Sequence, residues 1–199
     1  TGQQCQQQQQ QQRRLGLYST HLHHVNYTPT DDGARLAEIN VILAHHRQLG
    51  RRDHTATDRA PNNEGSGESS GGGPSFPVLL AADLNQARAR DMESFEGDWA
   101  VVAEGLARFG APTDDGVAKA LKENGFMCAS WDHASARRNF QGSAPPMTHW
   151  TGTTVDYIYA SSGVSEASDS SRAPLKVVGA YVAGSELSDH LPVVLDIEL

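Results

Sequence analysis

Short apolar runs bordered by polar clusters are the feature that most constrains the fold of this 199-residue chain. The runs have the length of buried strands, and in α/β proteins ligands and catalytic groups gather where strands end. We therefore expect the clusters at these ends to meet in one site. The four clusters are Thr20-His21-Leu22, Asp83-Leu84-Asn85, Asp156-Tyr157 and Ser188-Asp189-His190.

The run from 76 to 82 is the clearest predicted strand, and Asp83 and Asn85 follow it. Side chains alternate along a strand, which predicts that Asp83 and Asn85 point to the same side. Taken alone, this cluster also fits an ordinary turn, because Asp and Asn are favoured there. Asp156 is harder to explain in that way, because it lies inside an apolar segment and a buried carboxylate without a partner is costly.

The residue types in these clusters suit metal-assisted cleavage of a phosphate ester. Mg²⁺ prefers carboxylate oxygens, amide oxygens and water as ligands. This preference indicates Asp83, Asn85 and Asp189 as metal-binding residues, with Mn²⁺ as the alternative ion. The bound ion would neutralise charge on the phosphoryl oxygens.

Catalysis also needs a group that accepts a proton from the attacking water. His190 is the candidate general base, and Asp156 is the best placed residue to hold its other ring nitrogen. His21 is the candidate for contacting the phosphate and stabilising its developing charge. Asp83 and Asn85 complete the predicted catalytic set through the metal ion.

The four clusters, in this order, resemble the endonuclease/exonuclease/phosphatase superfamily, which has the deoxyribonuclease I-like fold. Its members commonly carry a Thr-His-Leu type motif, then Gly-Asp-Phe-Asn, then Asp-Tyr-Ile, then Ser-Asp-His before the final strand. This chain departs from the pattern at Ala82, where the family usually has Gly. The resemblance implies a mixed α/β (α+β) fold, part of a four-layer αββα sandwich. It also implies a divalent-metal-dependent phosphodiesterase, nuclease or phosphatase.

By the same resemblance, the chain corresponds to the C-terminal half of that sandwich, with the N-terminal half missing. The family's early strands carry an Asn and a metal-binding Glu, and nothing before His21 matches them. We expect a disordered Gln-rich segment at 1–14 and a domain at 15–199 with a flexible loop at 51–75. Two hypotheses stay open: a fragment of an active phosphoesterase, and a catalytically impaired fragment or interaction module of the same fold.

A second enzyme class uses histidines in a different way. The segment His21-Leu22-His23-His24 is similar to the start of the His-x-His-x-Asp-His zinc motif of metallo-β-lactamase-like hydrolases. Val25 and Asn26 occupy the last two positions of that motif, so two expected zinc ligands are missing. We therefore rank this hypothesis below the magnesium site.

Charge and composition restrict the partners. The net charge is −8, and no basic cluster of the kind that dominates nonspecific nucleic-acid binding is evident. Small phosphoesters are therefore favoured over nucleic acid, although a lipid headgroup fits the same chemistry. No apolar run is long enough to predict a transmembrane segment. The sequence indicates neither a compartment nor an oligomeric state.

Outside the clusters, the sequence predicts alternating helices and strands. Apolar residues at helical spacing indicate helices at 31–49, 98–109 and 116–124. We expect Trp150 either to pack against a ligand or to cap the core, and His45 and His46 to lie on solvated faces. The predicted strands are 15–22, 76–82, 126–131, 153–160, 175–181 and 191–199.

Overall fold

The predicted mixed α/β fold is confirmed by the computed structural model. It describes residues 14–23, 33–57, 74, 76–86, 104, 108, 116–132, 147–150, 153–161 and 175–198. The elements are β1 (Gly16–His21), α1 (Ala34–Thr57), β2 (Val78–Asp83), α4 (Val117–Glu123), β3 (Phe126–Cys128), β4 (Asp156–Ser161), β5 (Lys176–Val182) and β6 (Val193–Glu198).

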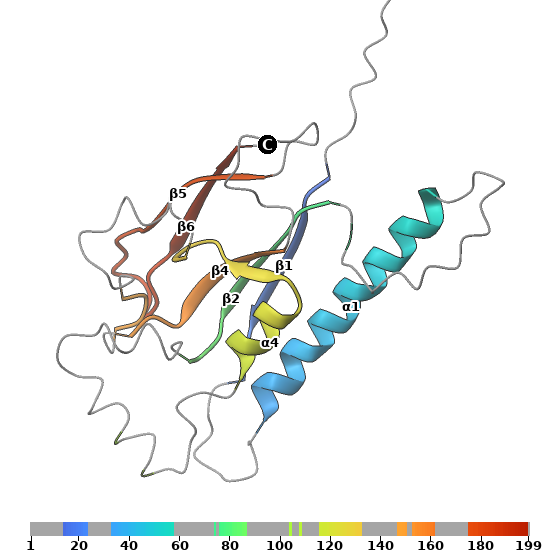
Figure 1. Cartoon of the computed structure of the whole chain (residues 1–199). Coiled ribbons are helices and arrows are strands. Elements are labelled where there is room, and N and C mark those ends of the chain that lie inside the picture. Colours follow the sequence, from blue (N-terminus) through green and yellow to red (C-terminus); the bar gives the residue numbers. More distant parts are fainter. Residues whose placement is uncertain are drawn as a thin grey trace, which may run out of the picture.

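Two sheets form the centre of the described fold. One has four strands in the order β1-β2-β4-β3, and the other is the β5-β6 pair. β1 and β2 run parallel, whereas β4 is antiparallel to both β2 and β3. Figure 1 shows α1 and α4 on one side of the four-stranded sheet and the β5-β6 pair on the other. The arrangement therefore has a helical layer and two sheet layers.

β2 is buried on both faces, which explains its continuous apolar sequence. Val78, Leu80 and Ala82 belong to the core that includes the α1 and α4 side chains. Leu79 belongs to the second core, which the β5-β6 pair covers. Because side chains alternate, Asp83 leaves the strand on the same face as Leu79. The sheet therefore directs this carboxylate toward the side of the second sheet.

The helix expected at 31–49 is longer than predicted, and the start of the predicted loop at 51 is wrong. α1 continues to Thr57, with Gly50 buried inside the helix rather than ending it. Arg51 and Arg52 are good helix formers, and the next proline is Pro61, so nothing stops the helix earlier. The remainder of the predicted loop, except residue 74, lies outside the described residues.

The other predicted elements differ little from the structure. The helix at 116–124 is confirmed as α4, and the strand at 126–131 ends at Cys128 because residues 129–132 turn. The helix at 98–109 and the Gln-rich segment lie almost wholly outside the described residues. Neither α1 nor α4 combines the length and apolar character that a membrane-crossing helix requires.

The expectation that His46 lies on a solvated face is wrong, because the residue is buried. It follows Leu43 by three positions on α1, so it shares the helix face that packs on the sheet. Its side chain is 3% exposed, and its ring centroid lies 4.7 Å from that of Phe126 in β3. Among the described residues, its Nδ1 atom has no hydrogen-bond partner. Burial, followed by the charges of Arg47 and His45, lowers the pKa of His46.

Candidate active site

Two carboxylates face each other where β2 ends and β4 begins. Asp83 is the last residue of β2, Asp156 is the first residue of β4, and the two are register partners. Their side chains are only 13% and 19% exposed. Like charges directly opposite each other on antiparallel strands repel. This edge of the sheet therefore favours a positively charged partner.

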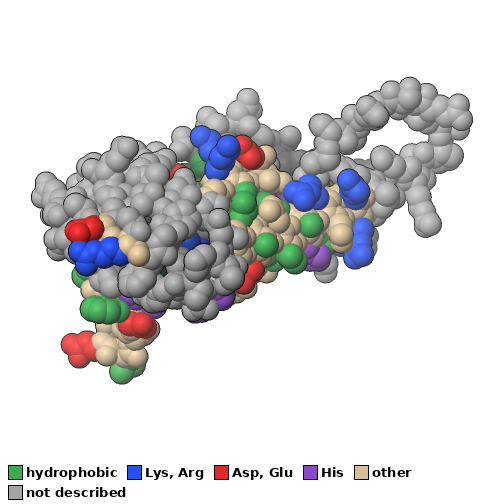
Figure 2. Space-filling view, turned by 90° about the horizontal axis from the view of Figure 1, so that it is seen from below, with side chains coloured by type: hydrophobic (Ala, Val, Ile, Leu, Met, Phe, Trp, Pro, Cys, Tyr) green, Lys and Arg blue, Asp and Glu red, His purple; other side chains and the backbone are tan. Residues whose placement is uncertain are grey.

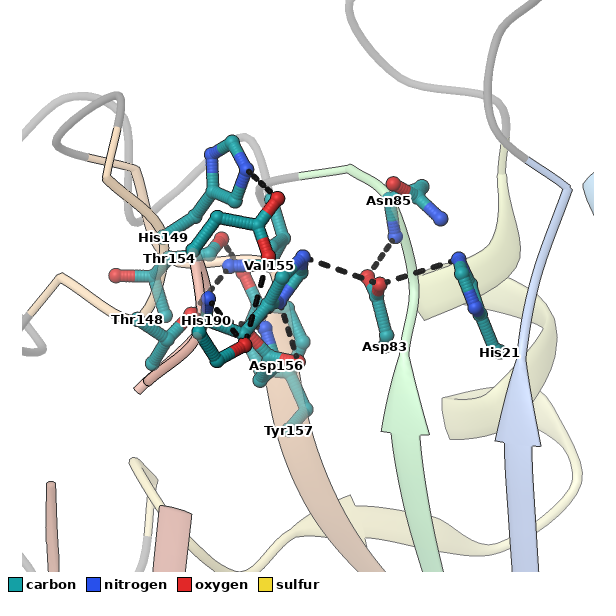
Figure 3. A network of polar contacts seen from close by, with 12 residues as sticks. His21, Asp83, Asn85, Thr148, His149, Thr154, Val155, Asp156, Tyr157 and His190 are labelled. Carbon is teal, nitrogen blue, oxygen red and sulfur yellow. Dashed lines mark hydrogen bonds and ion pairs between the residues drawn. The ribbon is translucent and has the colours of Figure 1, made fainter. Parts of the chain in front are cut away.

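His190, which carries a positive charge when protonated, lies between the two carboxylates. Its Nδ1 atom is 3.0 Å from Oδ2 of Asp156, and its Nε2 atom is 3.7 Å from Oδ2 of Asp83. On the other side, His21 Nε2 lies 3.4 Å from the same Asp83 oxygen. Figure 3 shows Asp83 between the two imidazole rings. Four residues that are distant in sequence thus form one polar row: His21, Asp83, His190 and Asp156.

The electrostatics of the row follow from burial and charge. Burial raises the pKa of Asp83, the N–H of Asn85 lowers it and the charge of Asp156 raises it, with a net increase. Burial lowers the pKa of His190, but the hydrogen bond and charge of Asp156, with the charges of Asp83 and Asp189, outweigh that effect and raise it. Both shifts reflect two acidic groups held close together with little solvent.

Asn85 does not continue the strand, so the strand alternation from which its direction was predicted does not extend to it. Its φ of 49° is left-handed, a conformation that Asn tolerates better than most residues. Its backbone N–H donates to Asp83 Oδ1 at 2.7 Å, and its Nδ2 donates to the carbonyl of Leu22 at 2.8 Å. The buried Arg35 donates to the Asn85 carbonyl at 2.8 Å. The turn is thereby fastened to the end of β1 and the start of α1.

Thr148 organises the site, although sequence reasoning assigned it no role. Its fully buried Oγ1 accepts hydrogen bonds from the backbone N–H groups of Val155, at 3.0 Å, and Asp156, at 3.1 Å. Its carbonyl accepts one from Leu191 N–H at 2.7 Å. Thr148 therefore connects the start of β4, which carries Asp156, with the segment that carries His190. The sequence signal was its place in the segment 146–152, which leads into the Asp156 strand and resembles a Thr-x-Trp segment of the superfamily.

His149 is a second residue that sequence reasoning missed. It forms an isolated antiparallel bridge with His190, and the two ring centroids are 4.7 Å apart. Its Nε2 lies 3.9 Å from Oδ2 of Asp189. Burial, and then the charge of His190, lowers the pKa of His149. The neighbouring Trp150 is 74% exposed, so it does not cap the core.

Two groups of three possible metal ligands occur in the described part of the chain. One is Asp83, Asp156 and His190, and the other is His149, Asp189 and His190. Asp189, predicted to accompany Asp83, falls in the group with His149, and it is 67% exposed. Neither group contains His21, from which the alternative zinc motif begins, and His24 of that motif lies outside the described residues.

The site has donors that fit a divalent cation. A hollow of about 410 Å³, a size typical of small-molecule sites, is lined by Asp83, Asp156 and His190 among others. The two opposed carboxylates supply oxygen donors, and burial, with the charge of Asp156, raises the pKa of Asp83. Mg²⁺ and Mn²⁺ accept such ligands. The residues present therefore suit the predicted ion.

No protein-family model and no curated protein matches the sequence. Among solved structures, the chain is similar to the human Nocturnin catalytic domain with bound sulfate, with a TM-score of 0.52 and 16% identity over 96% of this chain. It also matches a mannosyl-6-phosphatase from Bacteroides thetaiotaomicron, with a TM-score of 0.44 and 14% identity over 92% of this chain.

The chain spans about half the length of these solved structures, 49% of the first and 51% of the second. At such low identity, the likeness to the Nocturnin catalytic domain concerns the fold alone. It supports the deoxyribonuclease I-like fold that the four sequence motifs imply.

Proposed function

We propose that this protein is a divalent-metal-dependent phosphoester hydrolase of the endonuclease/exonuclease/phosphatase superfamily, with His190 as general base. The observation that carries the proposal is the contact of 3.0 Å between His190 Nδ1 and Asp156, beside the partly buried Asp83. A histidine oriented by a carboxylate, next to an oxygen-rich cation site, is what hydrolysis of a phosphate ester needs.

The proposed base has one nitrogen for each task. Nδ1–H donates to Asp156, which fixes the tautomer and stabilises the imidazolium that forms after proton transfer. Nε2 is then the acceptor for a proton from the attacking water. Its distance of 3.7 Å from Asp83 is longer than a direct hydrogen bond, so Asp83 does not occupy this acceptor.

Asp83, Asn85 and Asp189 are the proposed protein ligands of Mg²⁺, with Mn²⁺ as the alternative ion. The Asn85 N–H bond holds Asp83 in place, and Asp189 precedes His190 in the same segment. When bound, the ion supplies charge neutralisation for the phosphoryl oxygens. His21, 3.4 Å from Asp83, is the proposed donor to the phosphate.

A small phosphoester is the proposed substrate class, ahead of a lipid headgroup or nucleic acid. The Nocturnin catalytic domain holds a sulfate, an anion with the tetrahedral shape of phosphate, and this supports a phosphate-like ligand. The net charge of −8 disfavours nonspecific nucleic-acid binding. On the face in Figure 2, the visible Lys and Arg side chains are scattered rather than gathered in one patch.

Hydrolysis of bis-p-nitrophenyl phosphate with Mg²⁺ tests the proposal. We expect His190→Ala to lower the rate by about 10²–10⁴-fold. The matched control is His45→Ala, which removes an exposed histidine on α1. A rate that is the same in the wild type, His190→Ala and Asp83→Ala would exclude the proposed site.

Two outcomes would favour the alternatives. A folded protein without hydrolysis would favour the catalytically impaired fragment or interaction module. Hydrolysis with Zn²⁺ alone, and none with Mg²⁺ or Mn²⁺, would favour the metallo-β-lactamase-like hypothesis. Circular dichroism of each preparation establishes that the protein is folded before the rates are compared.

A further inference from the structure

We propose that His149, Asp189 and His190 form a second metal site, specific for a transition metal such as Zn²⁺, whose occupation blocks His190 as the base. The binding part of this inference stands on the geometry of the three side chains. The inhibitory part rests on the proposed function.

The three donors lie close enough to share one ion. One ligand atom of each residue lies within 4.8 Å of the others, and His149 Nε2 is 3.9 Å from Asp189 Oδ2. The imidazole rings of His149 and His190 are in edge contact, with centroids 4.7 Å apart. Asp189 is largely exposed, so its carboxylate is free to adjust toward an ion without disturbing the core.

Backbone pairing holds these donors together without an ion. His149 and His190 form an antiparallel bridge, Trp150 N–H donates to the Asp189 carbonyl at 3.0 Å, and Leu191 N–H donates to the Thr148 carbonyl at 2.7 Å. A site whose ligands are already in place loses less entropy when it binds its ion. The two short segments therefore act as a preformed support for the cluster.

The donor set distinguishes this cluster from the neighbouring one. Two imidazoles and one carboxylate suit Zn²⁺ and other late first-row metals, which bind nitrogen well. Mg²⁺ prefers oxygen ligands and holds its waters tightly. The oxygen ligands proposed for Mg²⁺ and the imidazole-rich trio thus favour different ions, although Asp189 belongs to both sets.

Sharing His190 has a chemical consequence. Its Nδ1 is engaged by Asp156, which leaves Nε2 as the nitrogen available to a metal. A metal bound at Nε2 uses the same lone pair that would accept the proton from water. Metal binding by the trio and general-base catalysis by His190 are therefore mutually exclusive, and Zn²⁺ inhibits hydrolysis that Mg²⁺ supports.

Visible absorption of Co²⁺, a spectroscopic substitute for Zn²⁺, tests the site directly. The protein is titrated with Co²⁺ in excess Mg²⁺, and Zn²⁺ is then added to displace it. Loss of an outer-shell partner already weakens metal binding by about 10–100-fold, so His149→Gln should weaken it by at least about tenfold. His45→Gln, the matched control on α1, should bind as the wild type does.

Equal Co²⁺ affinity in the wild type and His149→Gln would overturn the site. If His149→Gln does not fold, Asp189→Asn carries the same test, because it removes an exposed ligand and leaves the ring contact intact. The same criterion then applies: affinity equal to that of the wild type overturns the site, and a loss of at least about tenfold supports it.

Inhibition is measured separately. We expect Zn²⁺ to inhibit Mg²⁺-supported hydrolysis in the wild type, and His149→Gln to require at least about tenfold more Zn²⁺. Equal inhibition of both proteins would overturn the inhibitory role. Co²⁺ binding that depends on His149, in a protein without hydrolysis, would contradict the proposed function and leave the metal site standing.

Discussion

Asp83 and Asp156 lie directly opposite each other on the antiparallel strands β2 and β4. Two partly buried carboxylates in that relation repel, and the charge of Asp156 contributes to the raised pKa of Asp83, after the larger effect of burial. A pair of this kind lowers stability unless something positive lies beside it.

Replacing Asp83 should therefore stabilise the fold. Asp83→Asn keeps an oxygen for the Asn85 N–H and removes the repulsion, so we expect an increase in the free energy of unfolding of up to about 1 kcal/mol at neutral pH. Hydrolysis should be lost, because the proposed metal ligand is gone. Urea unfolding and the hydrolysis rate measure the two effects, and Asp196→Asn on the exposed side of β6 is the control. A less stable or equally active Asp83→Asn would contradict this explanation.

Asp156→Asn should affect catalysis more than folding. The amide cannot stabilise the imidazolium of His190 and can hold the wrong tautomer, so we expect kcat to fall by about 10²–10⁴-fold. Steady-state kinetics with saturating Mg²⁺ measure the change. A kcat within about twofold of the wild type would mean that Asp156 does not orient the base.

The sequence predicted the members of the polar row because each stands where an apolar run ends. His21, Asp83 and Asp156 follow directly from strand patterns, since β1, β2 and β4 end or begin at one edge of the sheet. His190 follows in the same way, because its cluster directly precedes the apolar run at 191–199. That Asp83 and Asp156 are register partners did not follow, because strand order and register depend on pairings that are distant in sequence.

The roles of Thr148 and His149 could not be predicted from strand patterns. Their roles come from backbone pairing between an irregular segment and the segment of His190, and neither has a periodic pattern. Strand alternation does not apply to Asn85, because its backbone is in the left-handed conformation. Local turn conformation, rather than hydrophobic patterning, decides these positions.

Thr148→Val should weaken the support of the site. Valine has nearly the same shape but no hydroxyl, so the N–H groups of Val155 and Asp156 lose their acceptor. We expect a loss of about 1–3 kcal/mol in the free energy of unfolding and a lower hydrolysis rate. Thr148→Ser keeps the hydroxyl, so its free energy of unfolding and its hydrolysis rate should be close to those of the wild type. If Thr148→Val matches Thr148→Ser in urea unfolding and activity, these hydrogen bonds do not matter.

His46 should make stability depend on pH. Its pKa in the folded protein is lowered from 6.5 by burial, so protonation favours the unfolded chain. This contribution to stability is present above the unfolded pKa of about 6.5 and is lost as the pH falls toward the lowered folded value. Urea unfolding measures the free energy of unfolding at about pH 7.5 and about pH 5.5. The decrease in this free energy between the higher and the lower pH should be smaller for His46→Phe than for the wild type. Equal decreases would show that His46 titrates alike in both states.

The most direct test of the central claim is a double-mutant cycle on kcat/KM for His190→Ala and Asp156→Asn, with bis-p-nitrophenyl phosphate and Mg²⁺. If Asp156 acts through His190, the double variant should be about as slow as His190→Ala alone, because residues that act as a unit are not additive. If the two losses multiply, or if His190→Ala leaves kcat/KM unchanged, then His190 and Asp156 do not form the base of a phosphoester-cleaving site.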